Sequence, residues 1–182
     1  MKHLKILIWV IIIIIVFIAI NYNTILKSIY KTEYKEYVEK YSKEENVDPL
    51  LVYAIIKAES NFEEGATSNR GACGLMQLLD GTAREVAENS VIEYESAETL
   101  YNPEINIRLG IKYFASLKKQ FGCTELALAA YNAGSGNVKE WIRNGTLKDD
   151  GSDIENVPFK ETNMYVRKIL NSYKIYKRLY NQ

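Results

Sequence analysis

The strongest constraint on the fold is an unbroken apolar run close to the start of the chain. Every residue from Ile6 to Ile20 is apolar, and the run reaches back to Leu4 if the Lys5 side chain extends toward the polar interface. This length approaches the roughly 20 residues that a helix needs to cross a bilayer. We therefore interpret residues 1–21 as a single transmembrane anchor.

Charged residues before the apolar run indicate its orientation. Lys2, His3 and Lys5 precede it, so the positive-inside rule keeps the N-terminus cytoplasmic and places everything after Asn21 on the extracytoplasmic side of the cell membrane. A cleaved signal peptide is the alternative, but the run is at the long end for one and the sequence Asn-Tyr-Asn-Thr from Asn21 is a poor cleavage site. A lipid-attached N-terminus would need a cysteine directly after the run, where none occurs.

About 160 residues follow the anchor, which is enough for one domain with a substantial core. They carry 21 Lys and Arg against 23 Asp and Glu. Because this near balance does not suggest a basic face, nucleic acid is not an expected partner. Cys73 and Cys123 could pair on the oxidising side of the membrane or remain as two small buried thiols, and the sequence leaves both possibilities open.

Histidine chemistry is excluded by composition. His3 is the only histidine, and it lies in the basic tip before the apolar run. Ser-His-Asp and Cys-His nucleophiles and the H-E-x-x-H zinc helix all require an imidazole near the reacting atoms. The chain is therefore an enzyme that works through carboxylates or no enzyme, and we expect neither a metal ion nor a cofactor.

Residues 22–44 are rich in Lys, Glu and Tyr. Tyr30, Tyr34, Tyr37 and Tyr41 recur at steps of three and four, which predicts one face of a continuous helix. This segment is either a stalk or the first helix of the domain. Packing against the domain is favoured, because tyrosines bury well with their hydroxyl groups at the edge.

Capping signals predict the remaining helices. Asp48-Pro49 opens a helix that carries Glu59 in its last turns, and Asn102-Pro103 opens another that Gly122 can end. Weaker signals predict an aspartate cap at Asp80 and a cap at Thr124 for a helix to Ala133. A break is expected at Gly134 and Gly136, followed by a helix over 138–143. A last helix is expected after Pro158, and its buried side carries Tyr165, Ile169, Tyr173 and Tyr176. The fold class is thus mainly α (α+β), with any sheet small and confined to residues 71–79.

Glu59 is the strongest candidate for catalysis. Ile55 and Ile56 lie one turn earlier, so burial against them would raise the pKa of the Glu59 carboxyl, and the negative end of the helix dipole would act in the same direction. A carboxyl that stays protonated near neutral pH can protonate a leaving oxygen. From the helix alone, however, a solvated surface glutamate is the favoured interpretation.

Two further segments change the weight of that candidate. With Glu59-Ser60, they resemble in sequence and order the lytic transglycosylases of the soluble type, relatives of goose lysozyme. The two segments are Gly71-Ala72-Cys73-Gly74-Leu75-Met76-Gln77-Leu78 and Ala130-Tyr131-Asn132-Ala133-Gly134-Ser135-Gly136-Asn137-Val138. The family order is also followed by Asn102-Pro103-Glu104 with Asn106 to Gly110, and by Val157 to Thr162 with Tyr165-Val166. The resemblance covers residues 45–176, and implies a catalytic domain over 45–182. One departure is Leu79-Asp80, where the family often has Met-Pro.

The resemblance implies a lysozyme-like fold whose groove binds peptidoglycan glycan strands. Glu59 would protonate the β-1,4 glycosidic oxygen between N-acetylmuramic acid (MurNAc) and N-acetylglucosamine (GlcNAc), assisted by the 2-acetamido group of the substrate. The same carboxylate would then deprotonate the 6-hydroxyl, which attacks C1 and leaves a 1,6-anhydro-MurNAc end. Substrate assistance of this kind is a known exception to the use of two enzyme carboxylates.

Eight further residues match family positions around the groove. They are expected to bind substrate or support the acid: Ser60, Ser68, Met76, Gln77, Tyr131, Asn132, Glu161 and Tyr165. Met76 would offer an adaptable apolar contact and Gln77 an amide, while Tyr165 would approach Glu59. For all except Tyr131 and Asn132, a purely structural role is an equal alternative.

Two other functions stay open at this point. A muramidase of the same fold would deliver water and usually needs a second carboxylate, which does not stand out in the sequence. A non-catalytic scaffold would bind glycan for a secretion or conjugation apparatus, although it would have no need of Glu59. The expected partners are peptidoglycan, the membrane through the N-terminal helix, and possible secretion, conjugation or divisome complexes.

Overall fold

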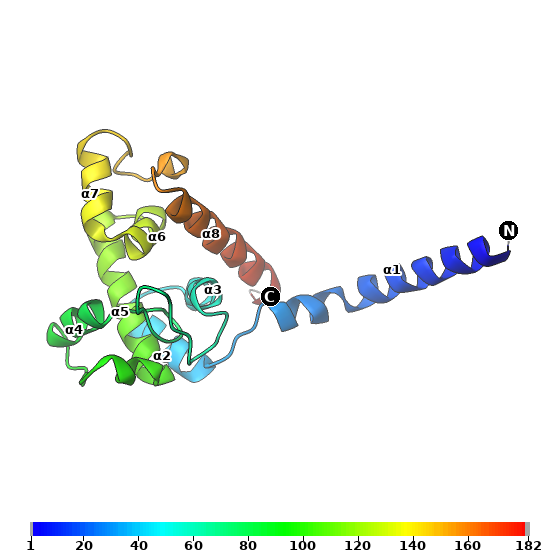
Figure 1. Ribbon diagram of the computed structural model, residues 1–182, viewed down its shortest axis with the longest axis horizontal. Helices are drawn as coiled ribbons and strands as arrows, with labels where there is room; N and C mark the ends of the chain where they lie inside the picture. The colour runs from blue at the N-terminus through cyan, green and yellow to red at the C-terminus, as the bar shows by residue number, and fades with distance from the viewer. Residues whose placement is uncertain (1, 181–182) are drawn as a thin grey trace.

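The computed structural model describes residues 2–180, and these fold almost entirely as helices (Figure 1). The helices are α1 Lys2–Ile29, α2 Lys35–Glu44, α3 Pro49–Glu59, α4 Asp80–Glu88, α5 Pro103–Phe121, α6 Thr124–Ala133, α7 Ser135–Arg143 and α8 Lys160–Tyr180, with short 3-10 helices η1 Ala97–Tyr101 and η2 Ile154–Asn156. Among these residues β structure is limited to isolated bridges that join Thr67 to Cys73 and Cys73 to Leu78. The predicted fold class is therefore confirmed.

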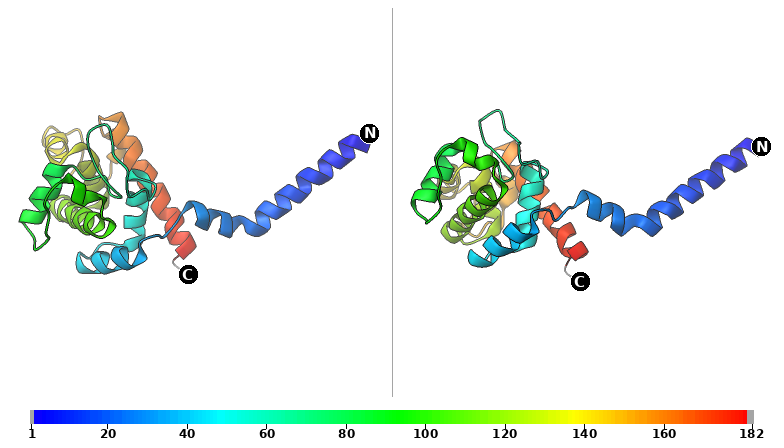
Figure 2. Two further views of the ribbon diagram at one scale, coloured as in Figure 1. Left: turned by 60° about the horizontal axis from the view of Figure 1, so that its bottom comes forward. Right: turned by 90° about the horizontal axis from the view of Figure 1, so that it is seen from below.

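Helix α1 extends away from the globular body in every view (Figures 1 and 2). The apolar side chains of residues 6–20 are exposed along its length. By length and composition α1 can cross a membrane, a test that an N-terminal signal sequence would also pass. The helix does not end near residue 21 but continues to Ile29, where it meets the body.

The continuous helix predicted across Tyr30 to Tyr41 is wrong. Helix α1 ends at Ile29 and α2 begins at Lys35, with Tyr34 in the left-handed region at φ 57°. Hydroxyl groups of α8 account for the break, because Tyr180 donates to the carbonyl of Tyr30 (2.8 Å) and Tyr176 donates to that of Lys31 (2.7 Å). Those carbonyls would otherwise accept from the next turn of helix. The predicted packing is correct, since α2 lies against α3 and α5.

Local capping signals predicted both ends of α5 and the start of α3. The Asp48 carboxylate accepts from the amide of Leu50 (2.8 Å), the Asn102 side chain accepts from that of Ile105 (3.2 Å), and Gly122 ends α5 at φ 76°. These predictions are confirmed.

Three weaker boundary predictions are wrong. Leu79 is the N-cap of α4, because the Asp80 carboxylate accepts instead from the hydroxyl of Tyr94 (2.6 Å). Cys123 is the N-cap of α6, one residue before Thr124. Gly136 lies inside α7, so the turn at Gly134 alone separates α6 from α7.

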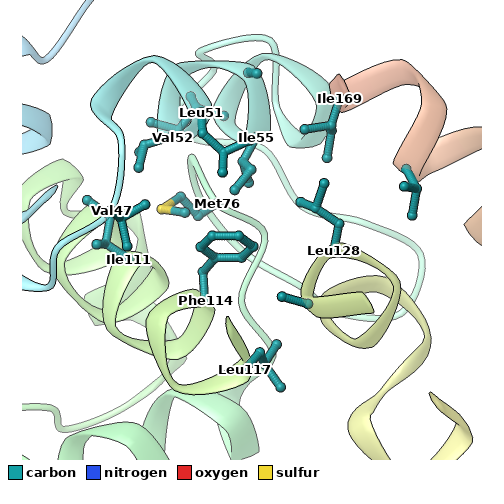
Figure 3. Packing of buried hydrophobic residues seen from close by; sticks show 14 of the residues in the cluster. Val47, Leu51, Val52, Ile55, Met76, Ile111, Phe114, Leu117, Leu128 and Ile169 are labelled. Carbon is teal, nitrogen blue, oxygen red and sulfur yellow. The ribbon is translucent and has the colours of Figure 1, made fainter. Parts of the chain in front are cut away.

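Helix α3 runs through the centre of the core, which explains why its residues from Leu50 to Ile56 are all buried. Figure 3 shows Leu51 and Ile55 of α3 facing Phe114 of α5, with Leu128 and Ile169 beside them. Helix α3 packs most extensively on α8. Burial of α3 on all sides fixes its C-terminal residue, Glu59, at the edge of the core.

The two cysteines are free and lie in different surroundings. Cys73 is buried in a small cluster with Leu78 and Leu100, whereas Cys123 is half-buried against the main core. The alternative of two separate thiols is the one that the structure supports.

A close approach between α5 and Met76 gives a test of this packing. A Cβ atom on Gly110 would lie 2.4 Å from Met76 Sδ and 2.8 Å from Met76 Cβ, whereas one on Gly81 in α4 would meet nothing within 4 Å. We expect Gly110→Ala to lower the free energy of unfolding by about 1–3 kcal/mol through overpacking. Gly81→Ala, the matched control, should raise it by about 0.5 kcal/mol. Urea unfolding followed by tryptophan fluorescence measures both, and equal effects at the two sites would contradict the packing described.

Candidate active site

Glu59 ends α3 with its carboxyl largely removed from solvent. Burial raises the pKa of the Glu59 carboxyl from its ordinary value of 4.5 to about 7. Two neighbours oppose this shift: the Tyr165 hydroxyl donates to Oε1 (2.6 Å), and the positive charge of Lys168 lies nearby. The direction predicted from Ile55 and Ile56 is therefore the one found. The carboxyl is half protonated near neutral pH, so it can both give and take a proton.

A cleft of about 660 Å³ opens beside Glu59. Its walls come from the segment after α3, from α4, α5 and α6, and from the start of α8. The lining residues are Glu59, Ser68, Asn69, Arg70, Ala72, Gln77, Leu78, Leu79, Thr82, Tyr113, Tyr131, Asn132, Ala133, Gly134 and Glu161. A cleft of this size, with many hydroxyl and amide groups, is suited to a large polar ligand.

The segment over 66–78 forms one wall of the cleft, and it depends on glycine. Gly74 has φ 76°, and a Cβ atom there would lie 2.2 Å from the carbonyl oxygen of Leu100 and 2.3 Å from Nδ2 of Asn106. Gln77, also in the left-handed region, donates from Nε2 to the carbonyls of Ala66 (3.0 Å) and Gly74 (2.9 Å). Gln77 therefore braces the loop and lines the cleft at once.

Asn106 of α5 holds this loop against the body. Its fully buried side chain accepts from the amide of Met76 (2.7 Å) and donates to the carbonyls of Cys73 (2.9 Å) and Leu100 (2.8 Å). The Cys73 carbonyl also accepts from the amide of Leu78 (3.1 Å), whereas the Met76 amide and the Leu100 carbonyl depend on Asn106 for a partner. Sequence reasoning noted Asn106 only as part of a matching motif and gave it no role.

Three of the eight predicted residues do not line the cleft, and two of these, Met76 and Ser60, do not contact Glu59 through their side chains either. Figure 3 shows Met76 in the core beside Val47 and Ile111, and its side chain is fully buried. Ser60 is buried too, and its hydroxyl donates to the carbonyl of Leu75 (2.8 Å). The predictions that Met76 lines the groove and that Ser60 bonds around the acid are wrong, because the loop turns both side chains inward. Both side chains instead hold the loop in place.

The remaining predicted residues gather around Glu59. Ser68, Gln77, Tyr131, Asn132 and Glu161 line the cleft. The Tyr131 hydroxyl donates to the carbonyl of Met76 (2.7 Å), and the Asn132 oxygen accepts from the hydroxyl of Thr162 (2.7 Å).

These contacts join the end of α6 to the glycine loop and to α8. Tyr165 is not part of the cleft wall but contacts Glu59 directly.

Several cleft residues escaped sequence reasoning. Tyr113 of α5 was given no functional role, yet it borders the cleft, and its ring lies 5.1 Å from that of Tyr131 at an interplanar angle of 46°. Arg70 is the single cation among the lining residues, and it lies between Ser68 and Gly71, inside a segment already singled out. Lys168 donates to the carbonyl of Ala58 (3.0 Å) and lies one helical turn after Tyr165. It belongs to none of the matching motifs, so the sequence did not indicate a role for it.

Comparison with known proteins agrees with this geometry. The family described as "Transglycosylase SLT domain" matches residues 36–154, so the chain belongs to that family. The soluble lytic murein transglycosylase of Escherichia coli strain K12 is 34% identical over 150 residues, which are 81% of this chain and 23% of that protein. The membrane-bound lytic murein transglycosylase F of Pseudomonas putida strain W619 is 34% identical over 115 residues, 59% of this chain and 22% of that protein.

A solved structure shares the fold. An inactive mutant of the lytic transglycosylase Slt from Pseudomonas aeruginosa superposes with a TM-score of 0.77 at 35% sequence identity, and the match covers 86% of this chain and 26% of that one. The chain thus spans about a quarter of the length of the relatives it matches. The lysozyme-like catalytic fold expected from the sequence is confirmed.

The raised pKa of Glu59 predicts a pH-dependent stability. The folded chain binds this proton more tightly than the unfolded chain, so the associated stability is complete below about pH 4.5 and is lost as the pH rises to about 7. Glu59→Gln escapes this loss and should be more stable than the parent chain by up to about 3 kcal/mol above pH 7. Urea unfolding at pH 5 and pH 8 measures the difference. Glu63→Gln, which removes one exposed acid, is the control, and a Glu59→Gln difference that does not grow with pH would contradict the burial.

The hydrogen bond from Tyr165 makes a second prediction. This bond favours the ionised carboxylate, so Tyr165→Phe should raise the pKa of Glu59 above its value of about 7. The carboxyl stretching band in infrared difference spectra, followed against pH, reports that pKa. Tyr173→Phe removes a hydroxyl of the same helix that bonds Asp48 instead, and it should leave the Glu59 titration unchanged. An unchanged titration in Tyr165→Phe would show that the bond does not form.

Proposed function

We propose that this chain is a membrane-anchored peptidoglycan lytic transglycosylase. It would cleave the β-1,4 bond between MurNAc and GlcNAc and leave a 1,6-anhydro-MurNAc end. The observation that carries the proposal is Glu59, a buried carboxyl with a pKa of about 7 at the wall of a cleft of about 660 Å³. Membership of the SLT domain family and relatives named as lytic murein transglycosylases support it.

The chemistry uses one carboxyl group twice. Protonated Glu59 gives its proton to the glycosidic oxygen as the bond from C1 breaks, and the 2-acetamido group of the substrate stabilises the positive sugar. The Tyr165 hydroxyl stabilises the carboxylate that results. That carboxylate then takes the proton of the 6-hydroxyl as its oxygen bonds to C1. The acid is restored, and no water is consumed.

The supporting roles follow from position. Ser68, Gln77, Tyr131, Asn132 and Glu161 lie where they can contact the glycan. Tyr113 offers an aromatic face to a sugar ring from the same wall. Ser60 and Met76 act indirectly, by fixing the loop that carries Gln77.

The proposed topology places residues 1–21 in the membrane. Residues 22–44 connect the anchor to the catalytic domain of residues 45–182 on the extracytoplasmic side. The exposed apolar surface of α1 supports this arrangement, because such a surface is stable in lipid and unfavourable in water. Relatives named as soluble and as membrane-bound forms both occur.

A hydrolase of the same fold is the second candidate, and one observation favours it. Glu161 lines the same cleft as Glu59, so a second carboxyl group that could activate water is present.

A scaffold without catalysis is less consistent with the site. Burial of an ionisable carboxyl lowers stability at neutral pH, a cost that glycan binding alone does not require.

Mass spectrometry of muropeptides decides between these candidates. We expect the full chain in detergent to release 1,6-anhydro-muropeptides from purified peptidoglycan, and Glu59→Gln to reduce that release by at least about a hundredfold, the size of effect typical for loss of a general acid. Glu63→Gln is the control for loss of an exposed acid three residues beyond Ser60.

Reducing-end products would instead identify a muramidase, and Glu161→Gln should then abolish them. Glycan binding without release by the parent chain would contradict both enzymatic candidates and leave a scaffold.

A further inference from the structure

Charge is strongly segregated along this formally neutral chain. All 23 Asp and Glu lie between Glu33 and Glu161, together with 14 Lys and Arg. Residues 21–31 and 162–180 contain no acid. They carry seven cations, which we call the junction cations: Lys27, Lys31, Arg167, Lys168, Lys174, Lys177 and Arg178.

The junction cations of α8 lie on one face. They are exposed, whereas Val166, Ile169, Tyr176 and Leu179 on the opposite face of the helix are buried. Of the seven, only Lys31 forms an ion pair among the described residues, with Glu33 at 3.0 Å. Helix α8 therefore presents an uncompensated basic stripe to its surroundings.

The stripe leads to the point where α1 leaves the body. The end of α8 lies close to that point in Figures 1 and 2. Lys57 of α3 donates to the carbonyl of Ile29 (2.7 Å), and the ring of Tyr30 meets that of Tyr176 edge-on at 5.4 Å. With the bonds from Tyr176 and Tyr180, these contacts hold the end of α1 against α3 and α8.

We propose that the junction cations dock the domain on the anionic headgroups of the bilayer that α1 crosses. The proposal rests on the membrane anchor of the proposed function. If α1 spans the bilayer, its last turns and the end of α8 lie at the lipid surface, where each Lys or Arg strengthens association with anionic lipid by about fivefold. The tyrosine rings at the same junction suit the membrane interface, where one end is apolar and the other wet.

Docking limits the distance between the catalytic cleft and the bilayer surface. Glu161 at the start of α8 lines the cleft, and Tyr165 contacts Glu59, while Tyr180 lies at the junction. At about 1.5 Å per residue, roughly 20 Å of helix separates Tyr165 from Tyr180. A docked domain therefore holds the cleft within roughly 20 Å of the bilayer. Its substrate is the layer of peptidoglycan next to the membrane.

An anionic wall polymer is the competing occupant of the stripe. Lipid is favoured because Lys27 lies over the ring of Tyr180 and Arg178 over that of Tyr22, at the exit of α1. Among the residues that line the cleft, Arg70 is the single cation.

Lysine acetylation of the full chain in lipid nanodiscs tests the docking directly. We expect Lys174 and Lys177 to react at least about threefold more slowly in discs rich in phosphatidylglycerol than in discs of phosphatidylcholine alone, with the difference removed by raised salt. Lys43, Lys119 and Lys139, exposed on α2, α5 and α7, are internal controls and should react equally in both discs. Equal reactivity of Lys174 and Lys177 in the two discs would overturn the proposal.

A triple variant distinguishes lipid contact made by the cations of α8 from lipid contact imposed by α1 alone. Replacing Lys174, Lys177 and Arg178 by Gln should abolish the lipid-dependent protection of Lys31 without changing the free energy of unfolding. The same three-charge loss at Lys43, Lys119 and Lys139 should preserve that protection. Protection by soluble poly(glycerol phosphate) but not by phosphatidylglycerol would assign the stripe to a wall polymer and also overturn the proposal. Because acetylation does not depend on turnover, its outcome is independent of the muropeptide experiment.

Discussion

The buried amide of Asn106 is the interaction on which the cleft depends. It joins the backbone at Cys73, Met76 and Leu100 and so fixes a glycine loop against α5. The fit is so close that Gly74 cannot carry a Cβ atom. With the loop fixed, Gln77 and Ser68 face the cleft, while the Met76 carbonyl receives Tyr131 from α6. One polar side chain thus sets the positions of groups from three parts of the chain.

Glu59 lies between two opposing requirements. Its position at the end of a fully buried helix removes water and raises the pKa of its carboxyl, which keeps an acid available near neutral pH. Burial alone would raise the pKa further and make the carboxyl too weak an acid to give up its proton in the proposed first step. The Tyr165 hydroxyl and the charge of Lys168 moderate the shift, and both come from α8. The value of about 7 is the balance of these effects.

Helix α8 couples this chemistry to the proposed membrane surface. Its first turns line the cleft, its middle contacts Glu59 and its last turns hold the end of α1. A formal net charge of zero concealed this arrangement, because the balance of the whole chain says nothing about where each sign lies. All the acids and 14 Lys and Arg lie between Glu33 and Glu161, whereas the seven junction cations lie in segments without acids.

Sequence by itself determined the mainly helical fold, the ends of α3 and α5, and the candidate acid, because caps, glycine stops and apolar runs act between neighbouring residues. It also brought Tyr131, Asn132, Glu161 and Tyr165 forward, through resemblance to a family. Tertiary structure alone decided that Met76 and Ser60 turn inward, that Tyr113 borders the cleft, and that the helix predicted across Tyr30 is broken. Each of these outcomes depends on hydrogen bonds or packing between segments far apart in the chain, which no local pattern encodes.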